Sequence, residues 1–351
     1  MNIIYNGLLL SRKKVTGVER FSRDQLRSMI NLLDNKPNTK VIILTNRELN
    51  IKLPNNFTAF NSNVVSQFSL FIFLPIFKLF FKSSIFISPL SVPSLFSTKH
   101  DIYTVHDVAW KIYPEHFPLK NKIHLNLAHF LLSKFRCKIH CVSNSTKNDF
   151  IKYYRPRDPN RIRAITPGLF REDFHRTIWN FNSEDILFVG TLQRRKNLKF
   201  LIDAMELLPK KFKLHVVGAP GWFFEKDIKD KSNRFIFHGY VDDSVKNRMV
   251  SNAYVLILPS LYEGWGYPVA ESLMLGTPVI TPKNSSLVEV NKIVELQYED
   301  GSLSSFIQAF ERLSSERVSI QKILNNVSDQ FEIDCFLHRF NEFIDYDYTS
   351  S

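Results

Sequence analysis

Two glutamates, Glu263 and Glu271, stand eight residues apart in the stretch LYEGWGYPVAESLMLGTPVI. Gly264 and Gly266 follow the first of them, although the chain has only 11 glycines in 351 residues. Glycine lets a backbone approach a ligand closely, and the amides at a helix start favour phosphate. Ionised carboxylates suit hydroxyl-rich ligands. The stretch therefore predicts a nucleotide-sugar site. In the competing interpretation Glu271 only complements a helix dipole and Glu263 is a solvated loop acid.

A second stretch, ILFVGTLQRRKNLKFLIDAM at 186–205, reads as a strand, a basic loop and a helix. Gly190 follows the strand, Arg195 and Lys196 precede the helix, and Asn197 is the expected N-cap. Cationic side chains beside a helix start strengthen an anion site. The spacing is not that of a Walker loop. The alternative is an ordinary exposed basic turn.

Short apolar runs alternate with amphipathic runs along the whole chain. The expected strands are 2–5, 41–45, 85–87, 102–105, 139–142, 162–165, 186–189, 213–217, 235–238 and 254–258. The expected helices include 18–32, 120–135, 144–153, 197–207, 244–252 and 269–275. Such alternation predicts an α/β fold with parallel sheets. The length favours two doubly wound domains that face across a cleft at the carboxyl ends of their strands.

The excess of positive charge lies entirely in the first half of the chain. Residues 1–163 hold 25 of the 46 Lys and Arg but 9 of the 34 Asp and Glu, so this half carries +16 and the remainder −4. This asymmetry predicts an anionic partner, either a membrane surface or nucleic acid, with a merely solvated surface as the alternative. Three cysteines of no metal-binding spacing favour a reducing, cytoplasmic setting. The first residues read as a strand rather than a signal peptide.

Several motifs together are similar to those of one family. The second half carries E-x7-E, VGTLQRRKN, HGYVDDSVKNRMVSNAYVLILPS and SSLVEV. The first half carries TGVERFSRDQL, YTVHDVAWKIYPEHF and CVSNSTKNDFIKYY. Over roughly 2–330 the chain resembles the retaining family 4 glycosyltransferases of GT-B fold, of the type that builds bacterial O-antigen and capsule. No single motif is specific, but the combination is.

The resemblance implies a role for each matching residue of the second half. Glu271 would hold the ribose hydroxyls of the donor, and Glu263 those of the transferred sugar. Arg195 and Lys196 would bind the diphosphate. The other donor-binding positions implied are Gly190, Tyr240 and Val241 near the base, and the backbone amides of Gly264, Trp265, Gly266 and Tyr267.

In the first half, Gly17 would approach the β-phosphate, and His106 would contact the sugar with Asp107 beside it. The catalytic residues implied are His106, Lys196, Arg195 and Glu263. The expected domains are an acceptor-side domain over 1–167, a nucleotide-sugar domain over 168–335, and a C-terminal helix with its tail over 336–351, which crosses back to the first domain.

The activity implied is a hexosyltransferase reaction with retention. The basic loop would stabilise the departing diphosphate, and no convincing D-x-D motif is present, since Asp242 and Asp243 read as a helix start. We therefore expect no metal and no cofactor. The resemblance implies mannose from GDP-mannose as the transferred sugar and a lipid-linked glycan as the acceptor. The alternatives are rhamnosyl, fucosyl or glucosyl transfer, a nucleotide-sugar epimerase of the same fold, or a binding subunit without catalysis.

The stretch FSLFIFLPIFKLFFK at 68–82 is too short to span a membrane. It predicts either a helix that inserts aromatic side chains into an anionic membrane surface or a buried core helix whose lysines reach out to solvent. We expect the first, and therefore a peripheral protein on the inner face of the cytoplasmic membrane. No motif for nucleic-acid binding is present.

Overall fold

The computed structural model describes residues 2–12, 15–34, 36, 38–49, 51–221 and 233–345. The chain divides into two compact units. The first unit comprises 1–108, 119–168 and 333–351, and the second comprises 109–118 and 169–332. The short segment 109–118 therefore belongs to the second unit, although it lies within the first half of the sequence. The expected tail beyond residue 345 lies outside the described residues.

The first unit is built on a parallel sheet of seven strands in the order β3-β2-β1-β4-β5-β6-β7. The strands are Asn2–Asn6 (β1), Lys40–Thr45 (β2), Phe57–Asn61 (β3), Ile85–Ser88 (β4), Ile102–Val105 (β5), Lys138–Cys141 (β6) and Ile162–Ala164 (β7). The inner strands are short apolar runs, as expected for parallel strands covered by helices on both faces.

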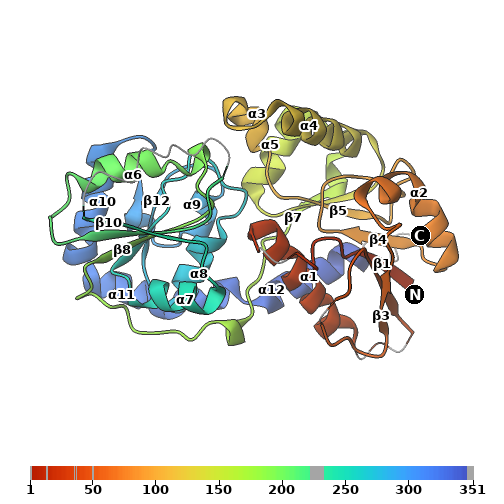
Figure 1. Ribbon diagram of the computed structural model, residues 1–351, viewed down its shortest axis with the longest axis horizontal. Helices are drawn as coiled ribbons and strands as arrows, with labels where there is room; N and C mark the ends of the chain where they lie inside the picture. The colour runs from red at the N-terminus through yellow and green to blue at the C-terminus, as the bar shows by residue number, and fades with distance from the viewer. Residues whose placement is uncertain are drawn as a thin grey trace. The chain divides into compact units, whose positions relative to one another are not determined.

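The helices of the first unit cover both faces of this sheet. They are Gly17–Leu33 (α1), Gln67–Phe80 (α2), Leu119–Lys134 (α4), Asn144–Tyr154 (α5) and Ile333–Asp345 (α12). In Figure 1, α1 and α12 lie on one side of the sheet, and α4 and α5 on the other. A lysine of β6 bonds to the end of α12: Lys138 Nζ donates to Phe343 O at 2.8 Å and to Ile344 O at 3.1 Å.

The second unit has a parallel sheet of six strands in the order β10-β9-β8-β11-β12-β13. The strands are Asp185–Val189 (β8), Lys213–Val217 (β9), Phe235–Gly239 (β10), Val255–Ile257 (β11), Val279–Pro282 (β12) and Gln297–Tyr298 (β13). The order reverses between β8 and β11, because β9 and β10 are added on one side of β8, whereas β11, β12 and β13 are added on the other. Open parallel sheets bind ligands at the carboxyl ends of the strands at such a point.

The helices of the second unit also lie on two sides of the sheet. They are Ala109–Ile112 (α3), Leu198–Met205 (α6), Asp243–Asn252 (α7), Tyr267–Leu275 (α8), Leu287–Val290 (α9), Leu303–Ser315 (α10) and Arg317–Val327 (α11). Figure 1 shows α7, α8 and α11 along one face and α6 and α10 on the other. No helix among the described residues is both long enough and apolar enough to cross a bilayer.

All ten expected strands are present within one or two residues, but three strands were missed. β3 is an edge strand whose residues are mostly exposed, β12 ends on a proline, and β13 has two residues. β3 and β13 lack the run of β-branched residues that marked the others, whereas in β12 such a run of three residues stands between two prolines. They are strands because they pair with neighbours in the sheets: β3 with β2, β12 with β11, and β13 with β12.

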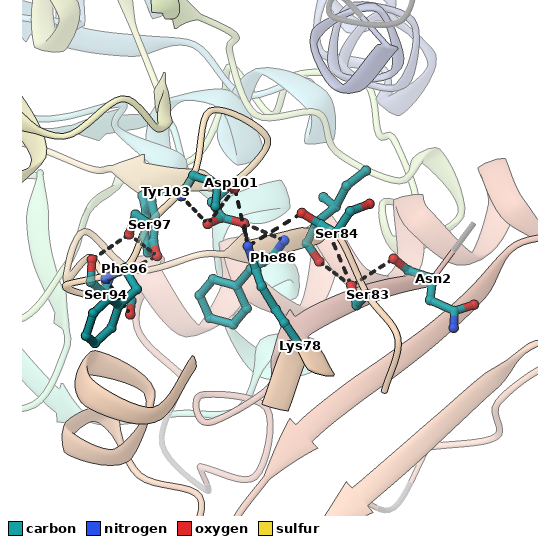
Figure 2. A network of polar contacts seen from close by, with 12 residues as sticks. Asn2, Lys78, Ser83, Ser84, Phe86, Ser94, Phe96, Ser97, Asp101 and Tyr103 are labelled. Atoms are coloured by element: carbon teal, nitrogen blue, oxygen red, sulfur yellow. Dashed lines mark hydrogen bonds and ion pairs between the residues drawn. The ribbon is translucent and has the colours of Figure 1, made fainter. Parts of the chain in front are cut away.

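A buried acidic side chain organises the middle of the first sheet. Asp101, which is fully buried, accepts hydrogen bonds from Lys78 Nζ at 2.6 Å, Phe86 N at 3.0 Å and Thr98 N at 2.7 Å. Figure 2 shows the lysine reaching this carboxylate from α2, beside a second group in which Ser97 bonds to Tyr103. Asp101 therefore ties α2 to β4 and to the loop that leads into β5.

Replacing Asp101 by Ala should destabilise the first unit. The change leaves Lys78 and two backbone amides without their shared carboxylate, and breaking such a buried pair costs about 3 kcal/mol. Hydrogen exchange of β4 peptides should report this loss in the free energy of opening. Asp34→Ala, at the exposed end of α1, is the matched control and should leave β4 exchange unchanged. Unaltered protection of β4 in Asp101→Ala would contradict the organising role of the carboxylate.

Candidate functional site

The basic loop of the second unit leaves the carboxyl end of β8. Gly190 follows that strand, and Arg194–Lys196 forms a single 3-10 turn before α6. Asn197 is the N-cap of α6 as expected, with a left-handed backbone and without a capping hydrogen bond from its side chain. The Lys196 stem runs back over Gly190, where a Cβ would lie 3.6 Å from Lys196 Cε. The lysine is thus folded inward, not held out as an exposed turn.

The loop after β11 is bonded directly to this basic loop. Leu261 N donates to Arg195 O at 2.9 Å, and Arg195 Nη1 donates to Tyr262 O at 3.1 Å. These bonds place Glu263 against the cationic side chains. The two loops, which are separated by more than 60 residues in sequence, therefore form one surface at the carboxyl ends of β8 and β11.

Glu263 is the centre of a buried charge cluster. Its side chain receives Lys196 Nζ in a short ion pair and Arg195 Nη1 at 3.4 Å. Glu263 and Lys196 are 6% and 7% exposed, which overturns the solvated-acid interpretation. Burial opposes ionisation of this carboxyl, but the two cations outweigh it and hold the pKa of Glu263 below its ordinary value. The site is therefore charged, with one anion facing two cations.

Two serines that the sequence analysis left without a role fix the backbone of Glu263. Glu263 N donates to Ser285 Oγ at 3.0 Å, and Ser286 Oγ donates to Glu263 O at 2.9 Å. Both serines belong to the SSLVEV motif. The motif was quoted for its resemblance, but only the fold brings it under the glutamate. These bonds position the carboxylate without using any of its oxygens.

The glycine-rich stretch opens α8 as the sequence predicts. Gly266 is the N-cap with φ 87°, a conformation that a Cβ would strain, and the helix begins at Tyr267 and ends at Gly276. Gly264 is buried between Glu263 and Trp265. Trp265 turns inward and packs against Phe331 with ring centroids 6.4 Å apart. The Trp265 side chain is thus part of the core, and only the backbone of this residue could contact a ligand.

Glu271 lies in the middle of α8 and is 4% exposed. Its Oε2 accepts from Lys246 Nζ of α7 at 2.8 Å. The lysine is the functional candidate that the sequence analysis missed. The sequence could have indicated it, because Lys246 stands four residues before Val250 and so lies on the same, buried face of α7. Just before α7, Tyr240 is half exposed and Val241 partly exposed, and Asp242 caps the helix as expected by accepting from Val245 N.

The remaining candidates lie in the first unit. Gly17 is the first residue of α1, and His106 with Asp107 follows β5. His106 Nε2 lies 2.7 Å from Pro89 O, and burial lowers the pKa of the imidazole. A carbonyl only accepts, so Nε2 carries the proton and Nδ1 of the neutral ring is the acceptor. His106 is thus suited to accept a hydrogen bond from a hydroxyl group.

The segment 109–118 brings a further pair of side chains to the second unit. Tyr113 Oη donates to Leu261 O at 3.3 Å, and the Tyr113 and His116 rings stack with centroids 5.5 Å apart. Burial lowers the pKa of His116, and the nearby Arg194 and Arg195 add to this effect. Sequence distance hid this contact, because 109–118 lies almost 80 residues before the basic loop.

Comparison with known proteins agrees with this geometry. Residues 170–326 match the sequence family described as glycosyl transferases group 1, and these residues lie within the second unit. Over 115 residues the chain is 32% identical to O-antigen chain mannosyltransferase B of Escherichia coli, covering 30% of each protein. The matches to curated relatives span between 29% and 52% of the relatives' own lengths.

Solved structures show the fold over the whole chain. WaaG, a glycosyltransferase involved in lipopolysaccharide biosynthesis, superposes with a TM-score of 0.73 at 16% identity, over 98% of this chain and 99% of its own. Anabaena Alr3699/HepE in complex with UDP and glucose gives 0.70 at 16% identity, over 99% and 100%. The protein therefore has the GT-B fold, with two Rossmann-like α/β domains.

The charge cluster makes two opposite predictions for anion binding. Lys196→Ala removes a cation and should weaken binding of inorganic pyrophosphate at least about tenfold, whereas Glu263→Gln removes the competing anion and should strengthen it by about as much. Titration calorimetry at low salt measures both. Glu206→Gln, which breaks the exposed pair with Lys210, is the matched control and should have no effect. Weaker pyrophosphate binding by Glu263→Gln would show that the cations do not share Glu263 with an anionic ligand.

Proposed function

We propose that the protein is a glycosyltransferase that moves a hexose from a nucleoside diphosphate sugar to an acceptor. The observation that carries the proposal is the cluster of Glu263 with Lys196 and Arg195 at the switch point of the second sheet. One site there offers cations to a diphosphate and a carboxylate to sugar hydroxyls. The group 1 family match over 170–326 supports the same function.

Each side chain has a chemical task in this reaction. Breaking the bond between sugar and diphosphate places negative charge on the leaving phosphate, and Lys196 with Arg195 would stabilise it, as a donor aimed at developing charge contributes about 3 kcal/mol. Glu263 would accept from hydroxyls of the transferred sugar, Glu271 from the ribose, and His106 Nδ1 from a further sugar hydroxyl. We propose transfer with retention and no metal, because the cations take the place of one.

The sugar and the acceptor are proposed from the relatives. The matched E. coli protein is an O-antigen chain mannosyltransferase, which supports mannose from GDP-mannose and a lipid-linked glycan acceptor in surface polysaccharide synthesis. The Anabaena neighbour was solved with UDP and glucose, so glucosyl transfer is the alternative that a specific observation favours.

A panel of nucleotide sugars tests the function and the donor together. Thermal stabilisation and donor hydrolysis are measured with GDP-mannose, GDP-fucose, UDP-glucose and dTDP-rhamnose, each with and without EDTA. We expect GDP-mannose to be bound and hydrolysed at equal rates in both conditions, and Lys196→Ala to hydrolyse it about 100-fold more slowly. Loss of the rate in EDTA with recovery in Mg²⁺ would contradict the leaving-group role of the cations, and no effect from any donor would contradict the function.

We also propose that the first unit binds the inner surface of the cytoplasmic membrane through α2, which would bring the enzyme to a lipid-linked acceptor. One face of α2 carries Leu70 and Leu74 and is buried in the unit. The opposite face leaves large apolar side chains exposed: Phe68, Phe73, Ile76, Leu79 and Phe80. Leu79 and Phe80 are 82% and 71% exposed. A surface of this kind suits insertion among acyl chains.

The charge around α2 favours an anionic membrane over a protein partner. Residues 49–100 contain four lysines and no aspartate or glutamate. Lys78 is bonded to the buried Asp101, so it does not reach out to solvent as the core-helix alternative would have it. Lys82, beyond the end of the helix, is exposed, as is Lys99. Lys82 follows the end of α2 directly, so anionic head groups at the apolar face would meet its charge.

Vesicle binding tests this surface. The protein should bind vesicles that contain anionic lipid, less so at high salt, and the double variant Leu79→Ser/Phe80→Ser should reduce binding at least about tenfold while donor hydrolysis persists. The matched control is Ile178→Ser/Val318→Ser, which removes equally exposed apolar side chains from the second unit. Equal binding to neutral and anionic vesicles, or an equal loss in both double variants, would contradict the role of α2.

A further inference from the structure

Lys246 is a buried cation that none of the roles above requires. It projects from α7 and is 9% exposed. Its Nζ lies 2.8 Å from Glu271 Oε2 and 2.9 Å from Asp243 Oδ1. Asp243 is in the first turn of the same helix and is mostly exposed, so the contact that reaches inside the unit is the one with Glu271.

Stability alone does not account for a lysine at this position. Lys246 and Val250 are the buried residues of α7, and an apolar side chain at 246 would continue that stripe. Replacing a buried ion pair by apolar side chains is often neutral or stabilising, whereas removing one partner leaves a costly lone charge. The lysine therefore matters through Glu271, which would otherwise be a carboxylate buried in α8 without this cation.

The contact also fixes the direction of the Glu271 side chain. A carboxylate has two oxygens that each accept more than one hydrogen bond, and an ammonium held against Oε2 sets the rotation of the group. An ionised carboxylate accepts at both oxygens, as two ribose hydroxyls require.

The helix that carries Lys246 is itself held firmly against α8. Asp242 caps its start, and Thr277 Oγ1, just beyond α8, donates to Val250 O at 2.8 Å near its end. Tyr240 and Val241, the candidates for contact with the base, come directly before the cap. One rigid helix thus relates the base end of the nucleotide site to the carboxylate expected at the ribose.

We propose that Lys246 is a positioning residue that makes the nucleotide site selective for ribose, by a charged hydrogen bond that holds the Glu271 side chain oriented towards the ribose hydroxyls. The proposal rests on the proposed function, because it takes Glu271 to be the ribose contact. Lys246 itself acts through Glu271 and does not touch the reacting atoms. Replacing Lys246 should therefore lower the ratio of the affinities for ribonucleotide and deoxyribonucleotide.

The experiment compares the affinities of GDP and UDP with those of their 2′-deoxy forms by titration calorimetry. Whichever of GDP and UDP binds the wild type more tightly should bind at least about tenfold more tightly than its 2′-deoxy form, since a lost hydrogen bond to a charged group costs about 1.5 kcal/mol or more. In Lys246→Met this ratio should fall close to one, and in Lys246→Arg most of it should return. Arg248→Met, an exposed cation on the same helix, is the control and should keep the ratio.

The outcomes separate this proposal from the function beneath it. A wild type that binds neither nucleotide overturns the proposed function, whereas one that binds the deoxy form equally well overturns the assigned role of Glu271 and, with it, that of Lys246. A selective wild type together with an equally selective Lys246→Met overturns only the role of Lys246. If Lys246→Met does not fold, Lys246→Gln, which keeps a hydrogen-bond donor without the charge, is measured in its place, and a ratio equal to that of the wild type overturns the proposal.

Discussion

The buried contact of Glu263 with Lys196 and Arg195 is the constraint on which the second unit's site depends. A carboxylate this deeply buried is stable only while its cations stay beside it, because a lone buried charge costs several kcal/mol. The loops after β8 and β11 are therefore held together, and their backbones are bonded as well. These contacts hold the polar groups of the site in fixed positions, and fixed polar groups are the condition for electrostatic preorganisation.

A second buried pair of a glutamate and a lysine lies in α8, the helix that follows the loop of Glu263. Glu271 also meets a buried lysine from a different element, so each glutamate of the E-x7-E motif has its own cation. The two pairs differ in what surrounds them. Lys196 belongs to a loop with two neighbouring arginines, which suits a diphosphate, whereas Lys246 stands on the buried stripe of a helix, which suits the support of a carboxylate.

In the first unit a buried ion pair serves a different purpose. Asp101 draws Lys78 inward, so the only cation within α2 turns away from the face that carries Ile76, Leu79 and Phe80. That face is consequently apolar throughout and remains exposed. The interaction that secures the helix is thus also what leaves its outer surface suited to a bilayer, with Lys82 placed beyond the helix end.

The sequence by itself determined the α/β class, ten of the strands and the start of α8 at the glycine-rich stretch, because apolar periodicity, glycine and proline act over a few neighbouring residues. It also pointed to Glu263, Glu271, Arg195 and Lys196 as candidates. Only the tertiary structure decided that Glu263 is buried between two cations, that Ser285 and Ser286 hold its backbone, and that Lys246 meets Glu271. Those facts are contacts between residues 22 to 68 positions apart, and no local pattern specifies which strand ends become neighbours in a sheet.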